Sequence, residues 1–241
     1  MTDAELCTYL AAEAGRMLLN LQASGKYEGK ALGDEGDRLA NAFLCEALRR
    51  ERPNDALLSE EEKDCIDRCA SERIWIIDPL DGTREYSEGR SDWAVHVALA
   101  VRGDTRDGAV ALPGLGVTLS SDTPIALRAA HNPLRMLVSR TRPAAEAVAV
   151  AKLLGAELVP MGSAGAKAMA VVRGEADIYL HTGGQYEWDN CAPVAVAQAA
   201  GLHCSRVDGS PMRYNAPDPY LPDLLICRPE LVDDIMAALK I

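Results

Sequence analysis

The chain carries, between residues 74 and 83, the sequence Ile74-Trp75-Ile76-Ile77-Asp78-Pro79-Leu80-Asp81-Gly82-Thr83. Its first four residues are β-branched or aromatic, which predicts a buried strand. Proline cannot continue a sheet ladder, so we expect the strand to end at Asp78 and the chain to turn there. The two aspartates can offer carboxylates to a hard cation, while Gly82 and Thr83 can offer N–H groups to an anion. This turn therefore indicates a metal and a phosphate bound together.

A second interpretation of the same residues is an ordinary turn. Strand–Pro–Asp–Gly sequences are common in turns that do no chemistry. Taken alone, the motif favours a turn and a site about equally. Other parts of the chain have to decide between the two.

Length and composition limit the class of protein. A chain of 241 residues can form one large domain or two lobes that share a core. A hydrophobic content of 48% is ordinary for a globular protein and argues against disorder. A formal charge of −11 argues against binding to a nucleic-acid polymer or to an anionic membrane. It leaves an anionic small-molecule substrate open, because bound cations can invert the local field.

The seven cysteines are scattered and contain no Cys-x-x-Cys pair. Cys65 and Cys69 could lie one helical turn apart, but no second pair nearby would complete a zinc site. We therefore expect reduced thiols in a cytoplasmic protein. The amino terminus lacks the basic region and apolar run of a signal peptide. No stretch is long enough to span a bilayer.

The first half of the chain begins with two predicted helices. Apolar residues at helical spacing predict a helix over residues 3–22 and a second over 34–50, with a loop over 26–33 between them. The acids Asp34, Glu35 and Asp37 would crowd the first turn of the second helix. Interaction with the positive end of the helix dipole is the favoured explanation, and an acid pointing at a metal site is the alternative.

Four short strands are predicted around the central one. They cover residues 56–58, 93–101, 108–112 and 116–119. Consecutive strands with short connections predict an antiparallel sheet. Three acids, of which Glu60 is the first, follow the strand at 56–58. Such a run is normally a solvated face, but here it could place Glu60 beside Asp78.

The second half alternates strands and helices. Predicted strands cover 134–139, 157–159 and 177–180, and predicted helices cover 143–154 and 164–172. This alternation predicts an α/β lobe. We therefore expect a division near residue 130, with an α+β lobe over residues 1–130 and an α/β lobe over residues 131–241.

Two helix starts in the second half could contribute to a site. Asp189 precedes a helix of small residues that Gly201 closes, and it stands where an N-cap residue is expected. Gly162 and Ser163 precede the helix that contains Lys167, so this segment could contact an anion or a ribose. A plain N-cap alone could explain Asp189, and a start such as Gly162-Ser163 is more often a cap than a site.

Three separated segments now coincide: Ser59-Glu60-Glu61, Asp78-Pro79-Leu80-Asp81-Gly82-Thr83 and Glu187-Trp188-Asp189. Their order and content resemble the inositol monophosphatase superfamily of magnesium-dependent, lithium-sensitive phosphatases. The resemblance runs from about residue 5 to residue 230. It implies a layered fold of the sugar phosphatase type, combining α+β and α/β parts. The N-terminal lobe would carry most of the metal ligands, and the C-terminal lobe would complete the metal site and the substrate pocket.

The residues Arg84-Glu85-Tyr86 look like one branch of that superfamily, the CysQ-type 3′(2′),5′-bisphosphate nucleotidases. This branch removes the 3′-phosphate of 3′-phosphoadenosine 5′-phosphate, a by-product of sulfate assimilation. One alternative is a broader phosphatase acting on inositol 1-phosphate or fructose 1,6-bisphosphate. Another is a nucleotide-binding protein without turnover. Family habit also suggests a homodimer.

The resemblance assigns roles to the matching positions. Two or three Mg²⁺ ions would be held by Glu60, Asp78, the Leu80 carbonyl, Asp81 and Asp189. Catalysis would rest on Glu60, Thr83 and Asp37, which would orient and deprotonate the attacking water. Substrate contacts would come from Gly82, Thr83, Arg84, Ser163, Lys167 and Asp189. Residues 26–36, the region that in this family often forms a mobile loop near the third metal, depart from the family pattern.

Overall fold

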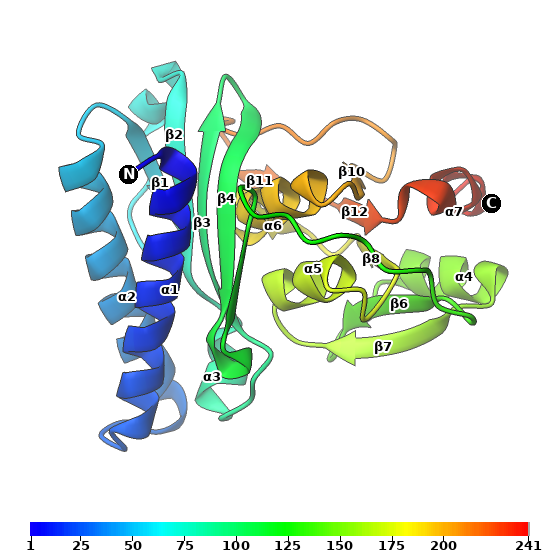
Figure 1. The fold of residues 1–241 in the computed structure, drawn as a ribbon, viewed down its shortest axis with the longest axis horizontal. Helices are drawn as coiled ribbons and strands as arrows, with labels where there is room; N and C mark the ends of the chain where they lie inside the picture. Colours follow the sequence, from blue (N-terminus) through cyan, green and yellow to red (C-terminus); the bar gives the residue numbers. More distant parts are fainter. Residues whose placement is uncertain (241) are drawn as a thin grey trace.

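The computed structural model describes residues 1–240. Its layers follow one another across Figure 1: two helices, a sheet, two helices, a second sheet, and two more helices. The helices are α1 Asp3–Ala23, α2 Gly29–Glu51, α3 Thr83–Ser87, α4 Ala145–Leu154, α5 Ala164–Val172, α6 Glu187–Ala199 and α7 Val232–Ala238. The α1–α2 pair covers one side of the first sheet, the α5–α6 pair lies between the sheets, and the α4–α7 pair covers the far side of the second.

The first sheet has the order β1-β2-β3-β4-β5. Its strands are β1 Ala56–Ser59, β2 Arg73–Asp81, β3 Ala94–Val101, β4 Asp104–Leu112 and β5 Val117–Ser120. All neighbours pair antiparallel except β1 and β2, which are parallel. The expected antiparallel sheet is therefore confirmed, with β1 as the exception.

The second sheet has the order β10-β12-β8-β6-β7. Its strands are β6 Arg135–Ser139, β7 Glu157–Met161, β8 Ile178–His181, β10 His203–Ser205 and β12 Leu224–Cys227. The β6 strand pairs parallel with both β7 and β8, as expected of an α/β lobe. A separate two-stranded pair joins β9 Gln185–Tyr186 to β11 Tyr220–Leu221.

Side-chain alternation along β2 explains why the sheet is covered on both faces. Trp75 and Ile77 pack in the core with α1 and α2, whereas Ile74 and Ile76 pack in the core with α5 and α6. Successive strand residues point to opposite faces, so one apolar run supplies both cores. The β2 strand is therefore buried on both faces, and its carboxyl end lies inside the molecule.

The end of β2 differs from the prediction. The strand continues to Asp81 instead of ending at Asp78. Its pairing with β3 is irregular between these two aspartates, where the register shifts. A bulge of this kind lets a strand accommodate Pro79, which cannot donate a ladder hydrogen bond.

The start of α2 also differs from the prediction. The helix begins at Gly29, so residues 29–33 are helical instead of forming a loop. A Cβ at Gly33 would lie 2.6 Å from the Ser87 hydroxyl oxygen, and a Cβ at Gly36 would lie 3.0 Å from the Tyr86 ring. Close packing against α3 therefore outweighs the low helix propensity of these glycines. The first turn contains no acid, so the proposed dipole interaction is wrong.

The α6 helix begins at Glu187, so Asp189 is its third residue and not its N-cap. The Asp189 carboxylate instead accepts a hydrogen bond from the N–H of Tyr186, 2.6 Å away, as the third residue of a capping box does. The prediction of an N-cap role is wrong by three positions. The carboxylate still faces the start of the helix.

The two sheets separate between β5 and β6, and the proposed boundary at residue 130 lies in that connection. The halves nevertheless share a core. A Cβ at Gly108 of β4 would lie 2.7 Å from the Ala195 side chain of α6. The division into two lobes stays a prediction.

The seven cysteines are free thiols, as expected. None of the helices formed by residues 1–240 has the length and apolar character needed to cross a membrane.

Candidate metal centre

Three carboxylates meet where the two halves of the chain touch. Asp78 and Asp81 come from the end of β2, and Asp189 comes from the first turn of α6. One oxygen from each lies within 4.8 Å of the others. Carboxylate oxygens are hard ligands, and the group contains no histidine or cysteine, so its chemistry suits Mg²⁺ better than zinc.

Protein donors orient two of these carboxylates. Asp78 Oδ1 accepts the N–H of Leu80 at 3.0 Å, and Asp189 Oδ2 accepts the N–H of Tyr186 at 2.6 Å. Each group is thus oriented through one oxygen and has the other to offer a cation. Backbone donors hold these side chains without bringing a positive charge near them.

Asp81 is held more firmly. Its carboxylate accepts hydrogen bonds from Ser163 Oγ at 2.5 Å and from the Gly165 N–H at 2.6 Å, and it lies 3.2 Å from His96 Nε2. Burial alone would raise the pKa of Asp81, but the contact with His96 and these hydrogen bonds outweigh it and lower the pKa to about 2. Asp81 is therefore the carboxylate of the group that stays ionised most easily.

The other acids are shifted in the opposite direction. Burial and the charge of Glu60 raise the pKa of Asp78 well above its usual value. Burial and the charge of Asp81 raise the pKa of Asp189 to about 6. Like charges collected in a buried site disfavour ionisation unless a cation binds them. The site therefore fits a divalent metal by charge as well as by ligand type.

Glu60 reaches this group because β1 runs parallel to β2. Ser59 pairs with Ile77, and the Glu60 N–H donates to the Ile77 carbonyl at 3.4 Å. The next residue on each strand is then an acid, so the register places Glu60 beside Asp78. Part of Glu60 is exposed to solvent. Desolvation of its carboxyl group by the surrounding protein, together with the charge of Asp189, raises the pKa of Glu60 to about 7.

Thr83 opens α3 directly after the acidic turn. Gly82 precedes it with φ of 90°, a conformation that glycine adopts without strain. The Thr83 hydroxyl donates to the Leu80 carbonyl at 3.1 Å and lies 3.5 Å from Asp37 Oδ1. Burial and the charge of Glu61 raise the pKa of Asp37 to about 7. Asp37 is thus brought to Thr83 from the middle of α2.

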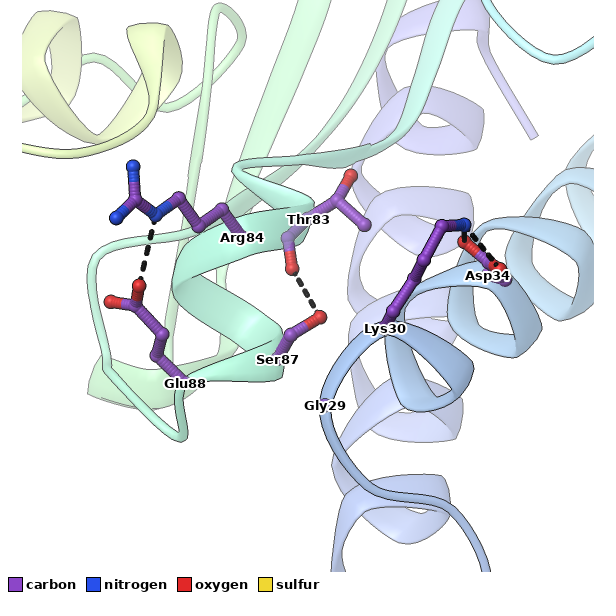
Figure 2. A pocket seen from close by; sticks show the side chains of 7 residues that line it. All are labelled: Gly29, Lys30, Asp34, Thr83, Arg84, Ser87 and Glu88. Atoms are coloured by element: carbon purple, nitrogen blue, oxygen red, sulfur yellow. Dashed lines mark hydrogen bonds and ion pairs between the residues drawn. The ribbon is translucent and has the colours of Figure 1, made fainter.

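A cavity of about 440 Å³ lies on the other side of Thr83, between the start of α2 and α3 (Figure 2). It is lined by Gly29, Lys30, Asp34, Thr83, Arg84, Ser87 and Glu88. Two ion pairs stand at its edges, Lys30 with Asp34 at 2.6 Å and Arg84 with Glu88 at 2.9 Å. None of the three clustered aspartates lines this cavity, so it is a neighbour of the metal site and not the site itself.

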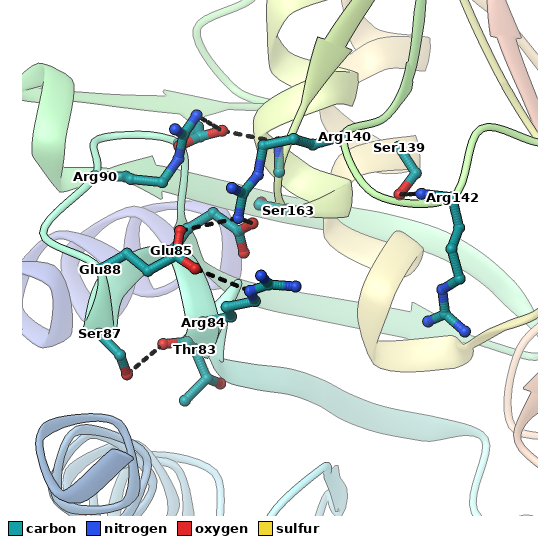
Figure 3. A network of polar contacts seen from close by, with 12 residues as sticks. Thr83, Arg84, Glu85, Ser87, Glu88, Arg90, Ser139, Arg140, Arg142 and Ser163 are labelled. Atoms are coloured by element: carbon teal, nitrogen blue, oxygen red, sulfur yellow. Dashed lines mark hydrogen bonds and ion pairs between the residues drawn. The ribbon is translucent and has the colours of Figure 1, made fainter. Parts of the chain in front are cut away.

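Arginines join α3 to the second half of the chain (Figure 3). Arg140, just after β6, binds Glu85 at 2.7 Å and Glu88 at 3.0 Å. The Gly162 N–H donates to Asp92 at 2.8 Å, and Asp92 in turn binds Arg90. These contacts fix the acidic turn relative to the loop before α5.

The structure also places the remaining residues of the predicted substrate set. Ser163 accepts the Ala166 N–H at 2.9 Å, as an N-cap residue does, while it donates to Asp81. Lys167 is buried, and its ammonium group donates to the carbonyls of Gly162 and Ser163. Burial lowers the pKa of Lys167. Its charge therefore lies beneath the loop.

Sequence reasoning missed His96. This fully buried residue of β3 has Nδ1 3.0 Å from the Trp188 carbonyl and Nε2 beside Asp81. It connects the two segments that carry the clustered aspartates. The available signal was a polar residue in the middle of the apolar strand Ala94-Val95-His96-Val97-Ala98.

Comparison with known proteins identifies the family. A sequence model described as the inositol monophosphatase family matches residues 5–238. The chain belongs to this family. The resemblance found in the three motifs is thereby confirmed, together with the expected fold class.

Among inositol monophosphatase relatives, the 3′-phosphoadenosine 5′-phosphate phosphatase of Mycobacterium leprae is 50% identical over 100% of this chain and 94% of that protein. The 3′(2′),5′-bisphosphate nucleotidase CysQ of Escherichia coli K12 is 30% identical over 77% of this chain and 80% of its own. These names state the activities of the two relatives.

Solved structures agree on the fold. CysQ from Bacteroides thetaiotaomicron superposes with a TM-score of 0.81 at 24% identity, covering 94% of this chain and 97% of its own. The inositol monophosphatase of Anabaena sp. PCC 7120 has a TM-score of 0.75 at 23% identity, covering 98% and 94%.

Proposed function

We propose that this protein is a Mg²⁺-dependent phosphomonoesterase that converts 3′-phosphoadenosine 5′-phosphate to AMP and phosphate. The observation that carries the proposal is the meeting of Asp78, Asp81 and Asp189 beside Thr83. The choice of substrate is supported by relatives of 50% and 51% identity that bear this activity in their names.

Mg²⁺ would be held by Glu60, Asp78, Asp81, Asp189 and the Leu80 carbonyl, as two or three ions. When bound, it would polarise the phosphate oxygens and lower the pKa of a coordinated water. Hard oxygen donors and like charges in a buried site support this assignment.

Thr83 and two acids would handle the attacking water. Because the Thr83 hydroxyl donates to the Leu80 carbonyl, its oxygen is available to accept a hydrogen bond from water. Asp37 and Glu60 both have a pKa raised to about 7, which is the range in which a carboxylate can accept a proton near neutral pH. These residues would orient the water and take up its proton.

The substrate would be held on both sides of this centre. The N–H groups of Gly82 and Thr83 stand at the start of α3 and would bind the phosphate, while Asp189 would contact the substrate beside it. Arg84 projects from the same helix, Ser163 lies in the loop before α5, and Lys167 lies in α5 beneath that loop. Arg84 and the bound Mg²⁺ would supply positive charge to a substrate with two phosphates in an otherwise acidic protein.

The test compares phosphate release from 3′-phosphoadenosine 5′-phosphate with release from inositol 1-phosphate, each with Mg²⁺, with EDTA and with added Li⁺. The proposal expects preference for the nucleotide, loss of release in EDTA and a lower rate in Li⁺. Preference for inositol 1-phosphate would overturn the substrate while keeping the metal site. No release from either would favour a binding protein without turnover.

Three further features are predictions: a cytoplasmic location, a role in sulfate assimilation and a homodimer. Light scattering coupled to size-exclusion chromatography would measure the mass of the particle in solution and decide the last of these.

A further inference from the structure

Three aromatic side chains gather beside Asp189. They are Tyr186, Trp188 and Tyr220, and we call them the aromatic shelf. Tyr186 and Trp188 stack with ring centroids 4.8 Å apart and planes 9° apart, while Tyr220 meets Tyr186 edge-on at 5.8 Å. The chain has 3 Trp, 7 Tyr and 1 Phe, so three of its eleven aromatic rings lie at this one place.

The shelf faces solvent, unlike the other close aromatic pair of the structure. Tyr186 is 44% exposed and Tyr220 is 47% exposed. Tyr86 and Trp93 also contact each other, but both are fully buried in the core under α1 and α2. Burial in the core therefore explains the Tyr86–Trp93 pair. In the shelf, Trp188 packs against the core around α5 and α6, whereas Tyr186 and Tyr220 keep nearly half of their surface exposed.

Local structure holds these rings in place. The β9–β11 pair sets Tyr186 directly opposite Tyr220. Gly184 adopts φ of 80°, and a Cβ there would lie 2.5 Å from the Tyr220 hydroxyl. Glycine thus allows the Tyr220 ring to lie against the backbone of the loop that leads to Asp189.

The shelf is built on the same backbone as the candidate metal centre. The Tyr186 N–H donates to the Asp189 carboxylate at 2.6 Å. The Trp188 carbonyl contacts His96, whose other ring nitrogen lies 3.2 Å from Asp81. The backbone that carries Tyr186 and Trp188 therefore contacts the residues of the candidate metal centre directly.

We propose that the aromatic shelf binds the purine base of the substrate by stacking. The proposal rests on the proposed function, because it takes a nucleotide whose 3′-phosphate lies at Asp78, Asp81 and Asp189. Base faces stack on aromatic side chains without any need for matched hydrogen bonds. A sugar phosphate offers no such face, so the shelf would favour nucleotides over inositol or fructose phosphates.

The experiment measures binding of two probes by isothermal titration calorimetry in Mg²⁺: AMP and ribose 5-phosphate, which lacks the base. The variant is Tyr220→Ala, with Tyr220→Phe to restore the ring. The matched control is Tyr9→Ala, because Tyr9 is similarly exposed, at 50%, but lies on α1. Kinetics with 3′-phosphoadenosine 5′-phosphate and the oligomeric mass of each variant are measured in parallel.

Wild-type protein is expected to bind AMP more tightly than ribose 5-phosphate. Tyr220→Ala should weaken AMP binding and raise KM about tenfold while leaving ribose 5-phosphate unchanged. Tyr220→Phe should restore AMP binding, and Tyr9→Ala should not change it. Thermal melting of each variant checks that the fold persists.

Equal wild-type affinity for AMP and ribose 5-phosphate would overturn the proposal that the shelf binds the base. An equal loss of affinity for both probes in Tyr220→Ala would overturn it too. Conversion of a dimer to a monomer with AMP binding intact would overturn it in favour of a contact between copies of the chain. If wild-type protein releases no phosphate from the nucleotide but shows the ring-dependent binding of AMP, the proposed function fails and the shelf stands.

Discussion

Two groups of charged side chains join the halves of this molecule, and they are built in opposite ways. In the acidic centre, Asp78 and Asp81 from β2 meet Asp189 from α6. In the arginine bridge, one helical turn further along the chain, Glu85 of α3 and Glu88 just after it meet Arg140 from the other half. Both groups cross the same boundary, but the bridge pairs its carboxylates with an arginine, whereas among residues 1–240 Asp78 and Asp189 have no ion-pair partner and Asp81 has only His96.

The difference appears in the pKa values. Burial and neighbouring acids raise the pKa of Asp78 and Asp189, whereas the hydrogen bond from Arg84, together with the nearby charge of Arg140, lowers the pKa of Glu88. The bridge therefore stabilises the fold by pairing opposite charges, and the acidic centre costs stability until a cation binds. Buried acids that lack ion-pair partners, in a protein whose other charges are largely paired, are typical of a binding site.

The largest effect is expected from Asp78→Asn, which removes one charge of the acidic centre. The amide keeps the shape of the buried side chain but removes the charge, so turnover should fall at least a thousandfold. Without metal, the same change should stabilise the fold by about 1 kcal/mol, because it removes a buried like charge. Phosphate release and urea unfolding in EDTA measure the two effects. A folded variant with a near-normal rate would contradict the metal assignment.

The next largest effect should come from Thr83→Val, which removes the hydroxyl between Asp37 and the Leu80 carbonyl. We expect kcat to fall about a hundredfold with Mg²⁺ affinity unchanged. Thr83→Ser keeps the hydroxyl and is the matched control. A parallel loss of Mg²⁺ affinity would mean that Thr83 acts on the metal site and not on the water.

Metal binding should depend on pH. Raised pKa values near 6 for Asp189 and near 7 for Glu60 mean that the folded metal-free protein takes up protons that the unfolded chain does not hold between about pH 4 and 7. These groups therefore make the metal-free fold less stable as pH rises through that window. Because protons compete with Mg²⁺, the gain in Tm from Mg²⁺ should be small at pH 5 and several degrees at pH 7.5. A gain independent of pH would contradict the assignment.

Removing a negative charge from the arginine bridge should lower the stability of the fold, whereas Asp78→Asn should raise the stability of the metal-free protein. Glu85→Gln keeps an oxygen that can accept from Arg140 but removes the negative charge of the pair, and it should cost about 1–2 kcal/mol of stability. Mg²⁺ affinity should stay as in wild type. Urea unfolding measures the first and calorimetry the second. A large loss of Mg²⁺ affinity would show that the bridge is needed to keep the acidic centre in place.

The smallest effect should come from Asp34→Asn. Asp34 pairs with Lys30 on the surface of α2, where both side chains are exposed. An exposed pair of this spacing contributes less than about 0.5 kcal/mol. Thermal melting should therefore barely change, which separates Asp34 from Asp37 only three residues further along the same helix.

Local pattern was sufficient for most strands and helices and for the motifs of the site. The apolar run before Asp78 predicted β2, and small or apolar residues at helical spacing predicted α5 to the residue. The sequence motifs alone point to the acids at residues 60, 78, 81 and 189 as candidate site residues. Their chemistry depends on residue type, which the sequence states directly.

Errors occurred where distant packing outweighs local preference. Gly33 would normally disfavour a helix, but contact with α3 makes it part of α2. Asp189 has the features of an N-cap, yet the N-cap of α6 is Tyr186, three residues earlier, where β9 pairs with β11. Both cases depend on contacts with residues remote in the sequence.

The sequence by itself therefore determined the family, the alternation of the buried strands and the residue types that a metal-dependent phosphatase needs. Only the tertiary structure showed that His96 links Asp81 to the segment of Asp189, and that Tyr220 stands beside Tyr186. The difference comes from the distance along the chain over which each kind of interaction acts. Periodicity and turn chemistry act over a few residues, whereas these contacts exist because the two halves fold against each other.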